Sequence, residues 1–104
     1  MPKKLAELAK ILRSKNAGAF VVTFDIMFAN REVFDEVQAT GVINAGLFAR
    51  LYSVPEEQCR LVEFPLAAAF KCSIPRPIPA GDVGDTDVYG CQWHGPLLGV
   101  EIPV

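Results

Sequence analysis

Four side chains that could take part in chemistry lie within one stretch of the chain, from Ile74 to Leu98. They are Arg76, Asp85, Asp87 and His94, the last being the only histidine in the sequence. The segment between Pro75 and Pro96 is rich in proline and glycine, and a connection of this length in a compact domain is usually functional or disordered. We therefore look for a binding or catalytic site in this long loop.

Arg76 lies between alternating prolines, Pro75, Pro77 and Pro79. Each proline fixes its own backbone angle and restricts the residue before it, so the entry to the loop is expected to be stiff and extended. A guanidinium held on a rigid segment suits bidentate capture of a carboxylate or phosphate. The alternative is that Arg76 pairs with an acidic residue of its own or a neighbouring subunit.

Asp85 and Asp87 are two residues apart, so in extended backbone they share a face. Two nearby carboxylates can bind a cation, or one can raise the pKa of the other for acid/base work. The spacing does not match the EF-hand calcium loop. The alternative is that these aspartates accept hydrogen bonds from backbone amides in turns.

His94 is a candidate general base because its ordinary pKa lies near neutrality, although a lone histidine can also be a hydrogen-bonded structural residue. Cys91 lies three residues before it, but zinc sites require three or four ligands and no second pair is present, so no metal site is predicted. The sequence contains no G-x-S-x-G, Walker A or G-x-G-x-x-G motif, and it leaves the cofactor open.

The composition predicts one folded domain spanning residues 1–104, with 51% hydrophobic residues and a net charge of −2. The apolar content of so short a chain favours an oligomer. The acidic balance argues against nucleic-acid binding, and no apolar run approaches the length of a membrane span. Three cysteines are an odd number with no close pair, which argues for reduced thiols. With a start that lacks the pattern of a signal peptide, this favours a cytoplasmic protein.

The hydrophobic pattern predicts both helices and strands. The spacing of Leu5, Leu8 and Leu12 predicts a basic amphipathic helix from Lys3 that ends between Ser14 and Gly18. Alternation predicts a strand over Ala19–Phe28 with the even positions, from Phe20 on, facing the core. Two helices are expected after the N-cap residues Asn30 and Asn44, the first ending at Gly41, and a short helical turn after Pro55.

Three further strands are expected at Arg60–Phe64, Ala68–Ile74 and Leu97–Ile102. The fold class is therefore α+β: a single two-layer domain with a small mixed or antiparallel sheet, helices on one face, and a long loop before the last strand. The inward sets expected of these strands are Val62 and Phe64; Phe70, Cys72 and Ile74; and Leu98, Val100 and Ile102. The second face of the sheet is expected to carry Thr23, Asp25, Lys71, Ser73 and Glu101.

Two segments of the chain carry a family resemblance: RSKNAGAFVVTFDIMF and IPRPIPAGDVGDTDVYGCQWHGPLL, joined by the VPEE turn. Over nearly its whole length the chain resembles the family known as domain of unknown function 4387. The resemblance places the family's S-K-N-A-G motif on Ser14–Gly18, its I-P-R-P on Ile74–Pro77, its G-D-T-D on Gly84–Asp87 and its histidine on His94. Cys91, Trp93 and Asp82 depart from the family pattern, which narrows the carboxylate pair to Asp85 and Asp87.

The resemblance also implies a partner, because members look like small stand-alone proteins or extensions of proteins that resemble the acyclic terpene utilisation protein A family. It suggests an accessory subunit of a heteromeric enzyme of carboxylic-acid or acyl-CoA catabolism, with a hydro-lyase and an isomerase as the candidate reaction classes. In this hypothesis Arg76 or Lys15 holds an acid group, Asn16 belongs to the same substrate-binding set, and Asp85, Asp87 or His94 completes the site. The alternatives are a non-catalytic homo-oligomeric structural or binding module, and a self-sufficient enzyme.

Overall fold

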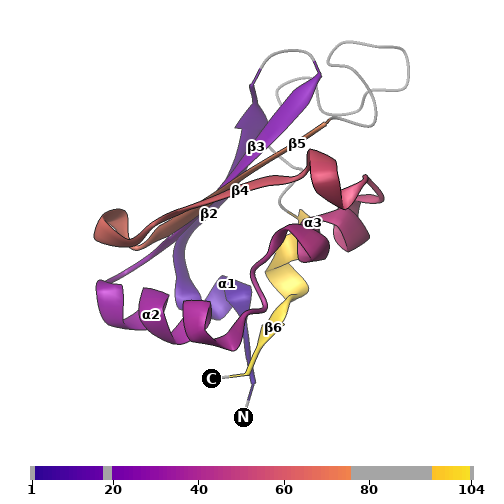
Figure 1. The fold of residues 1–104 in the computed structure, drawn as a ribbon. Helices are drawn as coiled ribbons and strands as arrows, with labels where there is room; N and C mark the ends of the chain where they lie inside the picture. The colour runs from indigo at the N-terminus through magenta and orange to yellow at the C-terminus, as the bar shows by residue number, and fades with distance from the viewer. Residues whose placement is uncertain (1, 18–19, 76–94, 104) are drawn as a thin grey trace.

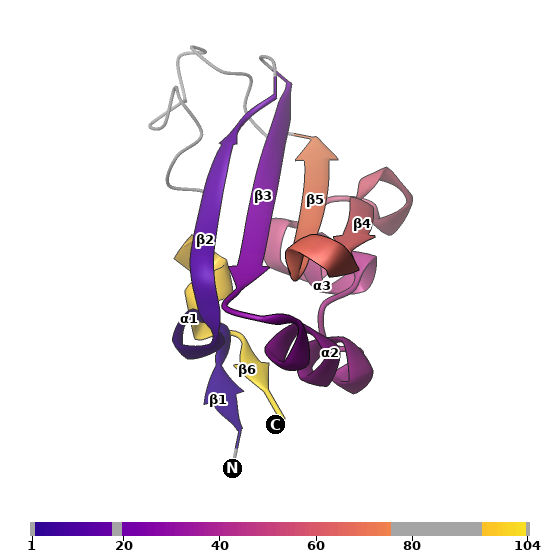
Figure 2. The same cartoon turned by 90° about the vertical axis from the view of Figure 1, so that its left-hand side faces the viewer.

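The computed structural model describes residues 2–17, 20–75 and 95–103, and its largest element is a four-stranded antiparallel sheet. The strands lie in the order β2-β3-β5-β4, as Figure 2 shows from left to right. Their bounds are β2 Ala9–Asn16, β3 Val21–Phe28, β4 Arg60–Phe64 and β5 Ala69–Pro75. The long strand β3 is central because it pairs with both β2 and β5.

The described helices lie on one side of this sheet, and none of them covers its other face (Figure 1). They are α1 Leu5–Leu8, α2 Arg31–Thr40 and α3 Ala45–Tyr52. The short 3-10 helices are η1 Glu56–Gln58, η2 Pro65–Ala67 and η3 Gly95–Gly99. The strands β1 Lys3–Lys4 and β6 Glu101–Ile102 form a separate two-stranded ribbon that brings both ends of the chain together. The predicted α+β class, with helices on one face of the sheet, is confirmed.

The predicted caps explain where α2 and α3 begin. The side chains of Asn30 and Asn44 accept hydrogen bonds from the backbone N–H groups of Val33 and Leu47, at 3.0 and 2.8 Å. The first of these helices ends at Gly41, whose φ of 70° lies in the left-handed region that glycine adopts without strain. Both helices and both caps were predicted correctly.

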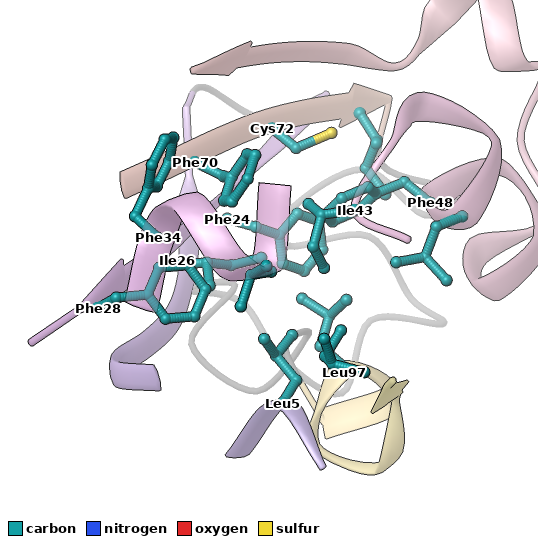
Figure 3. Close-up of a cluster of buried hydrophobic side chains, with 14 of the residues drawn as sticks. Leu5, Phe24, Ile26, Phe28, Phe34, Ile43, Phe48, Phe70, Cys72 and Leu97 are labelled. Carbon is teal, nitrogen blue, oxygen red and sulfur yellow. The ribbon is translucent and has the colours of Figure 1, made fainter. Parts of the chain in front are cut away.

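The core lies between the helices and the even-numbered face of β3 (Figure 3). Phe24 of β3 packs against Phe48 and Tyr52 of α3, with ring centroids 5.4 and 4.9 Å apart. Phe70 of β5 stacks on Phe34 of α2 at 4.8 Å. These rings come from segments far apart in sequence, and their burial fixes the two helices over the sheet. The predicted inward sets of β3 and β5 are confirmed except for Phe20, which is 67% exposed and directly precedes the first residue of β3.

The predicted first helix is wrong beyond Leu8, because Ala9–Asn16 form strand β2. From Leu12 onward the segment alternates as a strand does: Leu12 packs against the core and Ser14 is buried, whereas Arg13 and Lys15 are exposed. A register shift between Ala9 and Ile11 hides this period of two in the sequence. Pairing with β3 along the whole segment replaces the hydrogen bonds that a helix would have made.

The inward set predicted for β4 is also wrong, because Val62 and Phe64 are 43% and 46% exposed. Leu61 packs against the core instead, and Glu63 accepts a hydrogen bond from the side-chain amide of Gln38 in α2. The odd positions of β4 therefore face the helices. In a strand of five residues the alternation of side chains is visible, but which set faces inward depends on register.

The last predicted strand is shorter than expected. Only Glu101–Ile102 are in a strand, whereas Gly95–Gly99 form η3. The tight helical turn buries Leu97 and leaves Leu98 42% exposed, so Leu98 does not share the buried side of Ile102 as expected. Glu101 lies on the β1–β6 ribbon, so it does not contribute to the second face of the main sheet.

Candidate functional site

The face of the main sheet that points away from the helices carries most of the polar side chains of the strands, and we call it the open face. Residues directly opposite each other in antiparallel strands share a face, so the register defines its composition. One row across the sheet consists of Arg13, Asp25, Lys71 and Val62, and the next of Lys15, Thr23, Ser73 and Arg60. Thr23, Asp25, Lys71 and Ser73 were predicted to share this face, and they do.

The open face is positively charged. Arg13, Lys15, Arg60 and Lys71 are all exposed on it, and Asp25 is the only carboxylate in these two rows. The Nε of Arg13 lies 3.1 Å from Oδ2 of Asp25, so one of the four cations is neutralised locally. A face with an excess of cations, on a chain whose net charge is −2, favours contact with an anionic group or surface.

Two hydroxyl groups lie in the middle of this face. The Oγ1 of Thr23 and the Oγ of Ser73 are 3.3 Å apart and share a hydrogen bond across β3 and β5. Thr23 is buried, whereas Ser73 is half-buried. The threonine therefore fixes the position of a serine hydroxyl that is still accessible from the open face.

A pocket of about 470 Å³ opens at the end of the sheet beside Ser73. The chain reaches this point through η1, where the backbone N–H of Gln58 donates to the carbonyl oxygen of Pro55 at 3.0 Å before β4 begins at Arg60. The lining consists of Val21, Gln58, Arg60, Ser73, Ile74 and Pro75. It therefore combines a cation, a hydroxyl and an amide with apolar residues.

The match to a protein family covers almost the whole chain. The family described as domain of unknown function (DUF4387) matches residues 5–101. This chain belongs to that family. No curated protein and no solved structure matches it. The family resemblance of the two sequence segments is thereby confirmed.

Of the site residues predicted for this DUF4387 member, only Lys15 and Asn16 lie among the described residues. They are neighbours in β2, so their side chains point to opposite faces of the sheet. Lys15 is exposed on the open face, in the same row as Ser73 and Arg60. Asn16 is half-buried on the face that carries Leu12 and Ser14. The structure thus joins Lys15 to the open face and separates it from Asn16.

The other predicted site residues lie outside the described residues. They are Arg76, Asp85, Asp87 and His94, with Cys91 as the rejected metal ligand. Their grouping into one site stays a prediction.

Arg60, Ser73 and Gln58 were not predicted as site residues. Ser73 was expected on the polar face, but nothing in the sequence joins it to Arg60, which lies thirteen positions earlier. The register of β4 with β5 places these two directly opposite each other. The alternation of side chains along β4 does place Arg60 on the same face as Val62. The sequence analysis, however, assigned that face to the core.

The described cysteines are poor nucleophiles. Burial, with a smaller contribution from the nearby Cys59, raises the pKa of the Cys72 thiol to about 12. The pKa of Cys59 is also raised, first by burial and then by the carboxylates of Glu56 and Glu57. Both thiols therefore stay protonated at neutral pH, and Cys72 is buried whereas Cys59 is half-buried.

Neither a metal cluster nor a membrane span is found in the described part of the chain. Residues 2–17, 20–75 and 95–103 contain no group of three or more histidine, cysteine, aspartate or glutamate side chains that could hold a metal ion. No helix within these ranges has the length and apolar character needed to cross a bilayer.

Proposed function

We propose that this chain is a small accessory subunit of a heteromeric enzyme in carboxylic-acid or acyl-CoA catabolism. Its partner would be a large subunit that resembles the acyclic terpene utilisation protein A family, as the family resemblance implies. The observation that carries this proposal is the open face, a sheet surface with an excess of cations that no described helix covers. Such a surface offers both a contact area for another protein and groups that attract an acidic substrate.

An apolar edge beside the cations supports contact with a partner protein. Val62 and Phe64 of β4 are 43% and 46% exposed on the open face, and Leu66 in the following η2 is 99% exposed. These three side chains, which we call the apolar edge, lie within five consecutive residues. Exposed apolar side chains next to charged ones are typical of an interface, where aromatic anchors supply most of the binding energy.

The charge of the open face favours a different chain over a second copy as the partner. If two copies stacked through their open faces, the exposed Lys15, Arg60 and Lys71 of one would meet the same cations of the other. Like charges brought together in an interface are repulsive and costly to desolvate. A large subunit with an acidic surface avoids this repulsion. The homo-oligomeric module remains the second candidate, because the apolar edge could also join two copies side by side.

In this proposal, the chemistry is shared between the two subunits. Lys15 or Arg76 would hold the acid group of the substrate. Asp85, Asp87 and His94 would supply acid/base groups to a hydro-lyase or isomerase reaction. A self-sufficient enzyme is the weakest alternative, because one histidine and no nucleophile motif leave few catalytic groups in so short a chain.

Co-expression with a large protein that resembles the acyclic terpene utilisation protein A family tests the proposal. We expect the two chains to co-purify, and Phe64→Ser to weaken that association. Phe20→Ser is the matched control, because Phe20 is also an exposed phenylalanine but lies outside the apolar edge. Two chains that both fold and yet elute separately at low salt would remove the accessory-subunit proposal.

Substitution of Asp85 and of His94 separates the remaining candidates. Loss of assembly in either variant would favour the structural module, whereas intact assembly with loss of turnover by the complex would favour the shared enzyme. Turnover by the isolated chain would favour the self-sufficient enzyme instead.

A further inference from the structure

We propose that the pocket beside Ser73 binds a small organic monocarboxylate with a short apolar chain. The pocket lies between the start of β3, the end of β5 and the junction of η1 with β4. The proposal deepens the proposed function, on which it rests for its biological context, by naming a class of ligand. Its test uses the isolated chain, so it can succeed or fail independently of any partner.

The charge of the lining selects an anion. Among the described residues that line the pocket, Arg60 is the only cation, and none is an aspartate or a glutamate. Within residues 2–17, 20–75 and 95–103, the ion pairs are Arg13–Asp25 and Arg31–Asp35, so Arg60 has no carboxylate partner there. A guanidinium presents two parallel N–H donors that match the two oxygens of a carboxylate.

The neighbours of Arg60 strengthen this preference for an anion. In the paired strand β5, Ser73 lies directly opposite Arg60, and Lys71 lies on the same face two residues before Ser73. Both Lys71 and Arg60 are exposed, so they add to the positive potential at the mouth of the pocket. A ligand with a negative head group is therefore attracted to the side of the pocket that Arg60 and Ser73 form.

Two further polar side chains can contact the head group. The hydrogen bond between Thr23 and Ser73 fixes the Ser73 hydroxyl, and when Thr23 is the donor the O–H of Ser73 is available to a ligand. The side-chain amide of Gln58 supplies another N–H donor on the η1 side of the pocket. A carboxylate needs several donors to compensate for the water that it loses on binding.

The remaining walls select the rest of the ligand. Val21, Ile74 and Pro75 are apolar, and the volume of about 470 Å³ lies within the range of roughly 300–1,000 Å³ that is usual for small-molecule sites. The one cation among the described lining residues balances one negative charge, whereas a diphosphate would leave charge uncompensated. The combination fits a monocarboxylate whose apolar chain lies against Val21 and Pro75, because the side chain of Ile74 is buried in the core.

Titration of the isolated ¹⁵N-labelled chain with three probes tests the proposal by NMR. Hexanoate carries both the head group and the apolar chain, 1-hexanol lacks the charge, and inorganic phosphate lacks the chain. We expect hexanoate to bind most tightly and to shift the backbone amides of Val21, Ser73 and Ile74. Equal binding of 1-hexanol would overturn the role of charge, and tighter binding of phosphate would overturn the role of the apolar walls.

Arg60→Ala should weaken hexanoate binding about tenfold, because it removes a charge-assisted hydrogen-bonding group from the lining. Arg50→Ala is the matched control, since Arg50 is an exposed arginine on α3 and is not part of the lining. Both side chains are exposed, so neither variant should lose the fold, and circular dichroism would verify this. An equal effect of the two substitutions, or no amide shifts at tens of millimolar hexanoate, would overturn the proposal even if the chain co-purifies with a partner.

Discussion

Replacing Phe70 and Phe64 separately by alanine compares two phenylalanines of paired strands that face opposite sides of the sheet. Phe70 is 1% exposed, stacks on Phe34 at 4.8 Å and meets Phe28 edge-on at 6.1 Å. Truncating a buried phenylalanine to alanine costs about 3–5 kcal/mol, because the cavity adds to the lost burial. Domains of this size are stabilised by about 5–15 kcal/mol, so Phe70→Ala should remove a large part of the free energy of unfolding.

Phe64→Ala should cost far less. Phe64 is 46% exposed, so about half of the roughly 1.5–3 kcal/mol gained by burying a large apolar side chain is at stake. That fraction corresponds to about 1 kcal/mol. Leu66→Ala provides the lower reference, because Leu66 is 99% exposed and its truncation should cost almost nothing.

Urea denaturation followed by far-ultraviolet circular dichroism would measure all three variants. The slopes of the unfolding free energy against urea should match that of the parent chain, which would show that the folded state is unchanged. Repeating the measurement at two protein concentrations separates the domain from any assembly, since self-association through Phe64 would make its cost depend on concentration. If Phe64→Ala costs as much as Phe70→Ala at both concentrations, Phe64 is buried against the core and the register of β4 with β5 is wrong.

Three further predictions concern the turn after α2, a buried thiol and the ion pair on the open face. Gly41→Ala should destabilise the fold by about 1 kcal/mol, because Gly41 has a φ of 70° that alanine adopts only with strain. Gly99→Ala should be almost neutral, and thermal unfolding would compare the two variants. The free energy of unfolding should fall as the pH rises from about 9 to 12, because the pKa of the Cys72 thiol is 9.0 in the unfolded chain but about 12 in the folded one, so proton loss favours unfolding. Denaturation of the Cys72→Ala variant should show a smaller fall over the same pH range. A double-mutant cycle on Arg13 and Asp25 should give a coupling energy below about 1 kcal/mol that decreases with salt, because the arginine side chain is 58% exposed.

Each of these three has an outcome that would contradict it. An equal loss of stability in both glycine variants would show that added bulk, and not backbone strain, is responsible. A parent chain whose stability is constant between pH 9 and 12 would contradict the burial of the thiol. A coupling energy of several kcal/mol that is independent of salt would place the ion pair in a dry environment, contrary to its exposure.

The sequence by itself determined the elements whose signals are local. Asn30, Asn44 and Gly41 mark helix ends because a side-chain oxygen or a left-handed backbone satisfies groups at that position, whatever surrounds them. The alternation from Val22 to Phe28 marks a buried strand for a similar reason, since its period is a property of the strand alone. These signals were enough to predict the α+β class with helices on one face of the sheet.

The tertiary structure decided the features that depend on pairing between distant segments. Leu5, Leu8 and Leu12 satisfy a helical spacing, yet β2 forms because its backbone hydrogen-bonds to β3 and buries Ser14. Register alone determines that Phe64 faces outward, since a shift of one residue would exchange the two faces of β4.

The candidate site illustrates the same division between local and tertiary information. The sequence singled out Lys15 and the long loop through residue types and motifs. It could not place Arg60 opposite Ser73, because that contact arises from the antiparallel pairing of β4 with β5 and has no local signature. The pocket and the positive open face therefore follow from the pairing of strands, whereas the types of the residues that could bind a ligand there can be identified from the sequence.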